Sequence, residues 1–240
     1  MAKQSNLFYR GTVGKLVYYE LNGGYYVRSK PTRVNQTAAT KASAARFGMA
    51  VRNGNAIRQQ LLPLLPDAKD RRIMYRLNAA VYKWLLSPSF INPVPNQPVD
   101  ALTGFQFNEK TSWAERMKLP LQVDWQMNNE VVVTIPTIQP TASITAPAGT
   151  QEVQMQIMAI NCQVANNTVT ASAGENIIIP YTSALQPQRQ FTLPLSAISG
   201  ELAIVAASLQ YIIRSSHGMM VETKMQWKPA AIIDAVYSLK

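Results

Sequence analysis

The most reactive side chains in this sequence are a lone cysteine, Cys162, and a lone histidine, His217. A nucleophilic cysteine needs a cationic, partly exposed setting, whereas Cys162 lies in an apolar, strand-like pattern. A single histidine without cysteine or acidic companions cannot build a metal site. The 13 acids are scattered, and although two of them could meet in a fold, no spacing pairs them for glycosidase chemistry. We therefore expect no enzyme, no metal and no cofactor.

One glycine-rich segment, Gly11-Thr12-Val13-Gly14-Lys15, shares some letters with a phosphate-binding loop. A P-loop has four residues between its glycines and a serine or threonine after the lysine. Here two residues separate the glycines, and Leu16 follows the lysine. We interpret the segment as a turn between two strands.

The charge of the chain is concentrated at its beginning. Residues 1–58 hold ten basic residues and one acid, Glu20, whereas residues 119–240 hold five basic and seven acidic residues. Such a basic block attracts anionic surfaces. Only 15% of all residues are charged, against ~25% in an ordinary domain, so other copies are repelled weakly and can pack closely.

Aromatic residues alternate with cations in this basic block. Residues 7–30 predict a β-hairpin around Asn22-Gly23-Gly24, a sequence that favours a tight turn because Asn and Gly tolerate positive φ. Four tyrosines flank the turn: Tyr18, Tyr19, Tyr25 and Tyr26. A two-stranded hairpin is marginal in water, so this ribbon must lie on its own domain, on a neighbouring subunit or on single-stranded nucleic acid, whose bases stack on aromatic rings.

The rest of the chain predicts helices and then strands. Apolar spacing indicates one helix from about Thr40 and a second from about Asp67 to Leu86, followed by a proline-rich loop over 87–98. From Leu119 onward, short alternating segments indicate strands. The fold class we predict is α+β, mainly β: an N-terminal β-hairpin and two helices, then an antiparallel, Ig-like β-sandwich. The expected domains are 1–36, a ribbon and basic arm; 37–118, the helices and loop; and 119–240, the sandwich.

The N-terminal third also carries a resemblance. The segments that carry it are Gly11-Thr12-Val13-Gly14-Lys15-Leu16-Val17-Tyr18-Tyr19, Asn22-Gly23 and Tyr26-Val27-Arg28-Ser29-Lys30-Pro31, with Ala45-Arg46-Phe47-Gly48 and Leu61-Leu62-Pro63-Leu64 further on. They are similar to segments in a family of small, mostly uncharacterised proteins of Bacteroidota and their phages. The resemblance covers about residues 5–65. It implies no activity and adds to the case for a structural protein of a virion or filament.

Two hypotheses of function follow. In the first, the protein is a self-assembling, non-enzymatic structural subunit whose ribbon and arm contact other copies through Tyr18, Tyr19, Tyr25, Tyr26, Arg28, Lys30 and Arg33. In the second, the basic region binds nucleic acid through Arg10, Lys15, Arg71, Arg72 and Arg76. A third possibility is a carbohydrate or peptide binder that uses Trp113, Trp125 and Trp227 as platforms, although their apolar neighbours favour core positions.

The sequence also bears on location. No signal peptide is apparent at the N-terminus, and the longest apolar run, Leu202–Ile213, is shorter than the ~20 residues that span a bilayer. We expect synthesis in the cytoplasm, no membrane span and no small-molecule substrate, with a virion or a filament as the final location.

Overall fold

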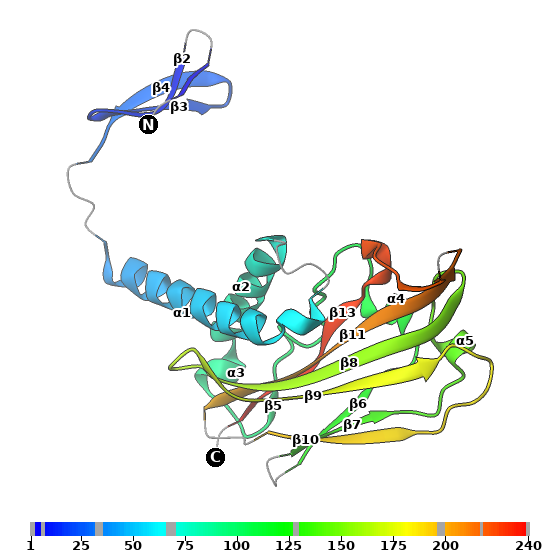
Figure 1. Ribbon diagram of the computed structural model, residues 1–240. Helices are drawn as coiled ribbons and strands as arrows, with labels where there is room; N and C mark the ends of the chain where they lie inside the picture. Colours follow the sequence, from blue (N-terminus) through cyan, green and yellow to red (C-terminus); the bar gives the residue numbers. More distant parts are fainter. Residues whose placement is uncertain are drawn as a thin grey trace. The chain divides into compact units, whose positions relative to one another are not determined.

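The computed structural model describes residues 3–5, 8–31, 36–65, 71–126, 130–195, 200–216 and 218–238. The chain divides into two compact units, Met1–Ser43 and Ala44–Lys240. We call them the N-terminal unit and the body. The fold is mainly β, with antiparallel sheets and a few helices (Figure 1), as the sequence predicts.

The N-terminal unit contains a four-stranded antiparallel sheet in the order β1-β2-β3-β4. Its two tight turns come from local sequence. Leu21 pairs with Gly24 around Asn22 and Gly23, both at positive φ (50° and 77°), which confirms the predicted turn. Gly14, at φ 58°, makes a second turn, between the strands that end at Val13 and begin at Leu16. The strands are β1 (Lys3–Ser5), β2 (Phe8–Val13), β3 (Leu16–Leu21) and β4 (Gly24–Ser29).

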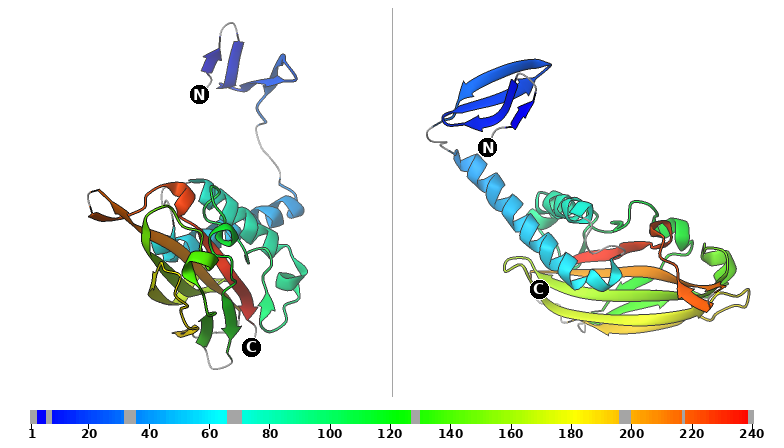
Figure 2. Two further views of the ribbon diagram at one scale, coloured as in Figure 1. Left: turned by 90° about the vertical axis from the view of Figure 1, so that its right-hand side faces the viewer. Right: turned by 45° about the horizontal axis from the view of Figure 1, so that its top comes forward.

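Two long helices, α1 (Ala38–Gln60) and α2 (Arg71–Leu85), cover one face of the larger sheet (Figures 1 and 2). The hydroxyl of Thr37 accepts a hydrogen bond from the backbone N–H of Thr40 (3.2 Å) at the start of α1. Phe47, which shares the three- and four-residue spacing of the apolar residues of this helix, is nevertheless 57% exposed. The buried stripe of α1 starts at Ala50.

The body contains a six-stranded sheet and a three-stranded sheet, both antiparallel. The larger has the order β5-β13-β11-β8-β9, with β12 paired to β11, and the smaller has the order β10-β7-β6. The strands are β5 (Gln97–Pro98), β6 (Gln122–Trp125), β7 (Glu130–Ile135), β8 (Thr150–Gln163), β9 (Thr168–Pro180), β10 (Arg189–Pro194), β11 (Glu201–Ser215), β12 (Gly218–Val221) and β13 (Ala230–Ser238).

Short helical turns connect these elements. Ser112 and Glu115 form a capping box at the helical turn that we expected within Thr111–Met117. The proline-rich stretch after α2, expected to be extended, begins with a helical turn. The turns are η1 (Leu62–Leu64), α3 (Pro88–Ile91), α4 (Trp113–Arg116), α5 (Pro140–Ser143) and η2 (Met225–Trp227).

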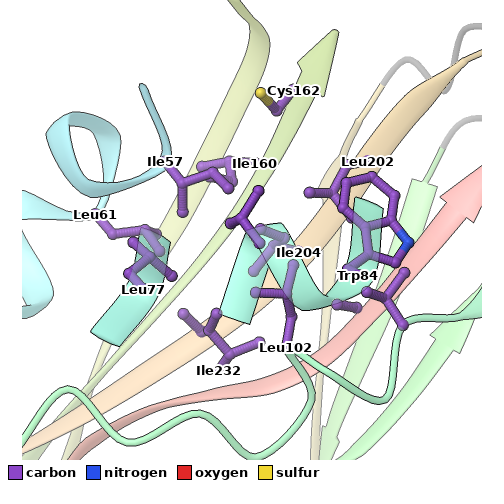
Figure 3. Close-up of a cluster of buried hydrophobic side chains, with 14 of the residues drawn as sticks. Ile57, Leu61, Leu77, Trp84, Leu102, Ile160, Cys162, Leu202, Ile204 and Ile232 are labelled. Atoms are coloured by element: carbon purple, nitrogen blue, oxygen red, sulfur yellow. The ribbon is translucent and has the colours of Figure 1, made fainter. Parts of the chain in front are cut away.

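Two hydrophobic cores lie on the two faces of the larger sheet. One packs the helices on that sheet and includes Ile57, Leu77, Trp84, Ile160 and Ile204 (Figure 3). The other lies between the two sheets. The body is therefore three layers deep, and the domain boundary expected at residue 119 runs through a shared core, because the helices complete the first core by packing on β8, β11 and β13.

This layering also explains why the apolar residues of the sequence change from odd-numbered to even-numbered positions near residues 157–158. Along β8, Met155, Ile157 and Ala159 pack into the core between the sheets, while Ile160 and Cys162 pack into the core under the helices. Side chains alternate between faces along a strand, so the pattern changes where the helices begin to cover the second face. The register shift itself lies at Asn161/Cys162.

Candidate interaction surface

The N-terminal unit carries many exposed apolar side chains. None of the side chains described over residues 8–31 is buried. The exposed large ones are Phe8, Tyr9, Val13, Leu16, Tyr19, Leu21, Tyr25, Tyr26 and Val27. Apolar patches of this kind on folded proteins usually mark a contact with another molecule.

Pairing between β3 and β4 distributes the tyrosines over both faces of the sheet. Tyr19 lies opposite Tyr26, and their rings stack with centroids 5.7 Å apart. Because side chains alternate along a strand, Tyr18 and Tyr25 lie on the other face. The four predicted tyrosines therefore form two pairs on opposite faces rather than one cluster.

Two neighbouring residues of β2 also contact tyrosine rings. Phe8 stacks on Tyr25 with centroids 3.8 Å apart, and Tyr9 lies against Tyr18 at 5.8 Å. On the first face, the ring of Tyr26 lies over Gly24, where a Cβ atom would meet the tyrosine ring at 2.9 Å. These contacts order the rings within the sheet but leave Tyr25 and Tyr26 about half exposed.

Cations surround the rings. The Arg28 guanidinium lies over the ring of Tyr19, 5.8 Å from its centroid. Arg10, Lys15 and Lys30 are exposed. The predicted contact residue Arg33 lies outside the described residues. Exposed rings and cations on the two faces of this sheet suit an anionic or carbonyl-rich partner.

On α2, the predicted nucleic-acid residue Arg76 makes contacts within the body. Its guanidinium donates to the backbone carbonyls of Gln106 (2.7 Å) and Phe107 (3.2 Å), and its Nε atom lies 3.1 Å from a carboxylate oxygen of Glu109. Arg76 therefore ties α2 to the segment after β5, which leaves its guanidinium fewer free donors for the phosphate contact that we predicted. Arg72 is exposed, and the side chain of Arg71 is not described.

Cys162 is fully buried. Burial, with a smaller contribution from Glu201, raises the pKa of its thiol to about 12. The thiol donates to the Oδ1 atom of Asn53 (3.4 Å). Such a cysteine is protonated at neutral pH and hard to reach, which is the opposite of a reactive thiolate.

Asn53 itself is a structural residue that we did not single out. Its Nδ2 atom donates to the carbonyl of Val164 (3.1 Å) and to the Oδ1 atom of Asn167 (2.9 Å). These bonds fix α1 to the turn between β8 and β9. An asparagine among alanines and glycines gives no sequence signal for such a role.

His217 lies outside the described residues. Over the parts of the chain that are described, no group of three or more His, Cys, Asp or Glu side chains is arranged to hold a metal ion. The glycine-rich segment at residues 11–15 is a strand-turn-strand, as we interpreted it.

The three tryptophans considered as ligand platforms are engaged within the body. Trp113 is buried. The indole N–H of Trp125 donates to Asp234 (2.7 Å). Trp227 is covered by the guanidinium of Arg116, 4.0 Å from its ring centroid, and packs edge-on against Tyr211. All three are therefore held by contacts within the body.

The two edges of the larger sheet differ. The outer edge of β13 bonds to the chain over residues 97–107: the N–H groups of Val99, Gly104 and Phe107 donate to carbonyls of β13, and Ile232 donates to Phe105. At the opposite edge, no comparable run of backbone hydrogen bonds covers β9 in the described chain: Arg189 donates to the carbonyl of Ile178 at 3.5 Å, and the N–H of Thr182 donates to the carbonyl of Pro180 at 3.0 Å. Open edges pair readily with other strands.

Comparison of the sequence with models of known protein families and with curated proteins finds no match. Among the described residues, no helix has both the length and the hydropathy needed to cross a membrane.

Proposed function

We propose that the protein is a non-enzymatic structural subunit that assembles with copies of itself, in a filament or a virion, through its N-terminal unit. The observation that supports this most directly is the absence of any buried side chain over residues 8–31 of a sheet rich in aromatic residues. A large apolar side chain contributes ~1.5–3 kcal/mol when it is fully buried. The N-terminal unit makes little use of this energy within its own fold.

The packing of the body also supports this proposal. Both of its cores are closed by residues between Ala50 and Tyr237. It therefore does not depend on the N-terminal unit for its stability, which leaves that unit available to another molecule. Residues 119–240 have few charged residues and slightly more acidic than basic ones. This part of a second copy is therefore an electrostatically suitable partner for the basic sheet of the N-terminal unit.

The test is the molar mass of the full chain in solution over a range of concentrations, measured by light scattering. We expect species above the 26.6 kDa of one chain, and a shift toward one chain in the double variant Tyr19→Ser/Tyr26→Ser. The matched control is Tyr75→Ser, because Tyr75 is a 63% exposed tyrosine on α2 of the body. A wild-type chain that stays monomeric at high concentration would show the proposal to be wrong.

Nucleic acid is the second candidate. The observation in its favour is the proximity of exposed rings and cations in the N-terminal unit, where Arg28 lies over Tyr19. Bases stack on such rings, and phosphates pair with such cations. Titration with labelled single-stranded DNA at two salt concentrations tests it: affinity that falls steeply with salt supports this candidate, and no binding at low salt removes it.

A further inference from the structure

β4 is an edge strand of the N-terminal sheet, and one hydrogen bond shows which of its residues point their backbone groups outward. Partners in an antiparallel pair alternate between residues that bond across to the neighbouring strand and residues whose backbone groups point away from it. Lys30 N–H donates to the carbonyl of Lys15 (2.6 Å), which extends the β3–β4 ladder by one pair. The even-numbered residues of β4 therefore bond to β3. The backbone groups of Tyr25, Val27 and Ser29 point outward.

The same argument fixes the open edge of the body. Tyr181 N–H donates to the carbonyl of Gln151 (2.8 Å), which extends the β8–β9 ladder. The odd-numbered residues at this end of β9 therefore bond to β8, and the backbone groups of Gly174, Asn176 and Ile178 point outward. The hydrogen bond that Ile178 accepts from Arg189 agrees with this phase.

Each of the two strands has one charged residue, and the two charges are of opposite sign. Arg28 is the only charged residue of β4, and Glu175 is the only charged residue of β9. If an antiparallel partner places Arg28 opposite Glu175, Val27 lies opposite Asn176 and Tyr25 opposite Ile178. These residues have outward backbone groups on both strands, so one register satisfies the hydrogen bonds and the charges together.

That register also joins exposed apolar side chains. Tyr25 is 52% exposed and Ile178 is 55% exposed. Ile178 also lines a cavity of about 340 Å³ on the sheet, with Gln154, Gln156, Asn176 and Gln210. An aromatic residue opposite a β-branched residue is a favourable cross-strand pair, and the tyrosine would cover part of this cavity.

We propose that β4 of one copy pairs with the open β9 edge of the next copy, with Arg28 opposite Glu175. This inference rests on the proposed self-assembly and names its acceptor. Each copy then carries one donor strand and one acceptor edge at different places. Contacts of this head-to-tail type generate rings when the rotation between copies closes and open filaments when it does not.

Cross-linking of full-length chains tests the pairing. Copies carrying Val27→Cys are mixed with copies carrying Asn176→Cys and treated with a short bismaleimide. The native Cys162 is fully buried and protonated at neutral pH, so it stays unmodified. We expect a cross-link between the two kinds of copy, at least tenfold above that between Val27→Cys and the control Ala79→Cys, a residue exposed on α2. A second pair, Tyr25→Cys with Ile178→Cys, guards against a local failure to fold.

The outcomes separate this inference from the function on which it rests. Light scattering that shows assembly, together with cross-links between β4 strands alone or no preference for Asn176 over Ala79, overturns the β9 acceptor and leaves self-assembly standing. A Val27→Cys/Asn176→Cys chain that links only within itself overturns the acceptor as well. A monomer at every concentration overturns both proposals.

A charge exchange tests the register. Arg28→Glu and Glu175→Arg are each expected to weaken association several-fold, because each places like charges opposite one another. The double variant is expected to return to within about twofold of the wild type. The control is Asp124→Arg, which makes the same change of charge as Glu175→Arg. Asp124 is an exposed residue of β6, an edge strand of the smaller sheet. Additive losses in the double variant would overturn the register.

Discussion

The N-terminal unit and the body have opposite patterns of burial. In the body, β11 is buried on both faces along residues 201–209, and two cores flank the larger sheet. In the N-terminal unit, a sheet with comparable apolar content has no buried side chain over residues 8–31. The difference indicates that the body encodes its own stability, whereas the N-terminal sheet carries apolar surface for use in contact with another molecule.

The largest expected effect comes from a cavity in the body. Leu77 is fully buried in the core under the helices, so Leu77→Ala is expected to lower the free energy of unfolding by ~2–5 kcal/mol. All four tryptophans lie in the body, so their fluorescence in a denaturant titration reports this unit alone. The matched change Leu21→Ala, at a 55% exposed residue of β3, should leave that transition unchanged. Equal effects of the two variants would contradict the independence of the body.

A smaller effect is expected where the two helices meet. A Cβ atom at Gly54 would overlap the side-chain amide of the buried Asn78 and lie 3.5 Å from its Cα atom. Gly54→Ala is therefore expected to destabilise the body by ~1–3 kcal/mol. At Gly48 the nearest atom is the flexible end of Arg52 at 3.3 Å, so Gly48→Ala should be neutral or stabilising by up to ~1 kcal/mol. The same fluorescence titration measures both, and a loss at Gly48 as large as that at Gly54 would contradict this account of the helix contact.

These two glycines illustrate how much of the fold could be predicted from the sequence. Glycine is unfavourable inside a helix, which suggests close backbone approach at both positions, but only Gly54 has such a neighbour. A local signal such as the Asn22-Gly23 turn was sufficient, because turn chemistry is encoded within a few residues. The helix layer was assigned to a separate domain, because an apolar pattern shows that a face is covered and not which segment covers it.

The candidate site could be predicted only in part for a related reason. The tyrosines and cations of the N-terminal unit stand out by residue type. The internal role of Arg76 could not be seen, because its acceptors are backbone carbonyls some thirty residues away. The open edge of β9 was equally hidden, since an edge is defined by strand order and not by the strand's own sequence.

Alkaline pH should destabilise the body selectively. Burial raises the pKa of Cys162 to about 12 and also raises the pKa of the phenols of Tyr211 and Tyr237. A raised pKa in the folded state favours the neutral form, so this stability is present in full below the ordinary pKa of each group and is lost as pH rises toward the folded value. For Cys162 the loss begins near pH 9 and reaches about 1 kcal/mol by pH 10. Denaturant midpoints at pH 8 and pH 10 measure it; Cys162→Ala should reduce the difference, and an unchanged difference would contradict the role of the thiol.

The reaction rates of single thiols compare the N-terminal sheet with the body at individual residues, with little change in stability. In native Val27→Cys, at a dilution where the copies are dissociated, the new thiol lies on an exposed strand and should react with a maleimide within the mixing time at pH 7. Cys162 should react only when the body opens, because it is buried, protonated and bonded to Asn53. Its labelling rate should therefore rise with denaturant in parallel with the tryptophan transition, and Leu77→Ala should accelerate it while Leu21→Ala does not. Fast labelling of Cys162 in the native wild type would show that the core under the helices opens without unfolding of the body, and the contrast between a closed body and an open N-terminal sheet would no longer hold.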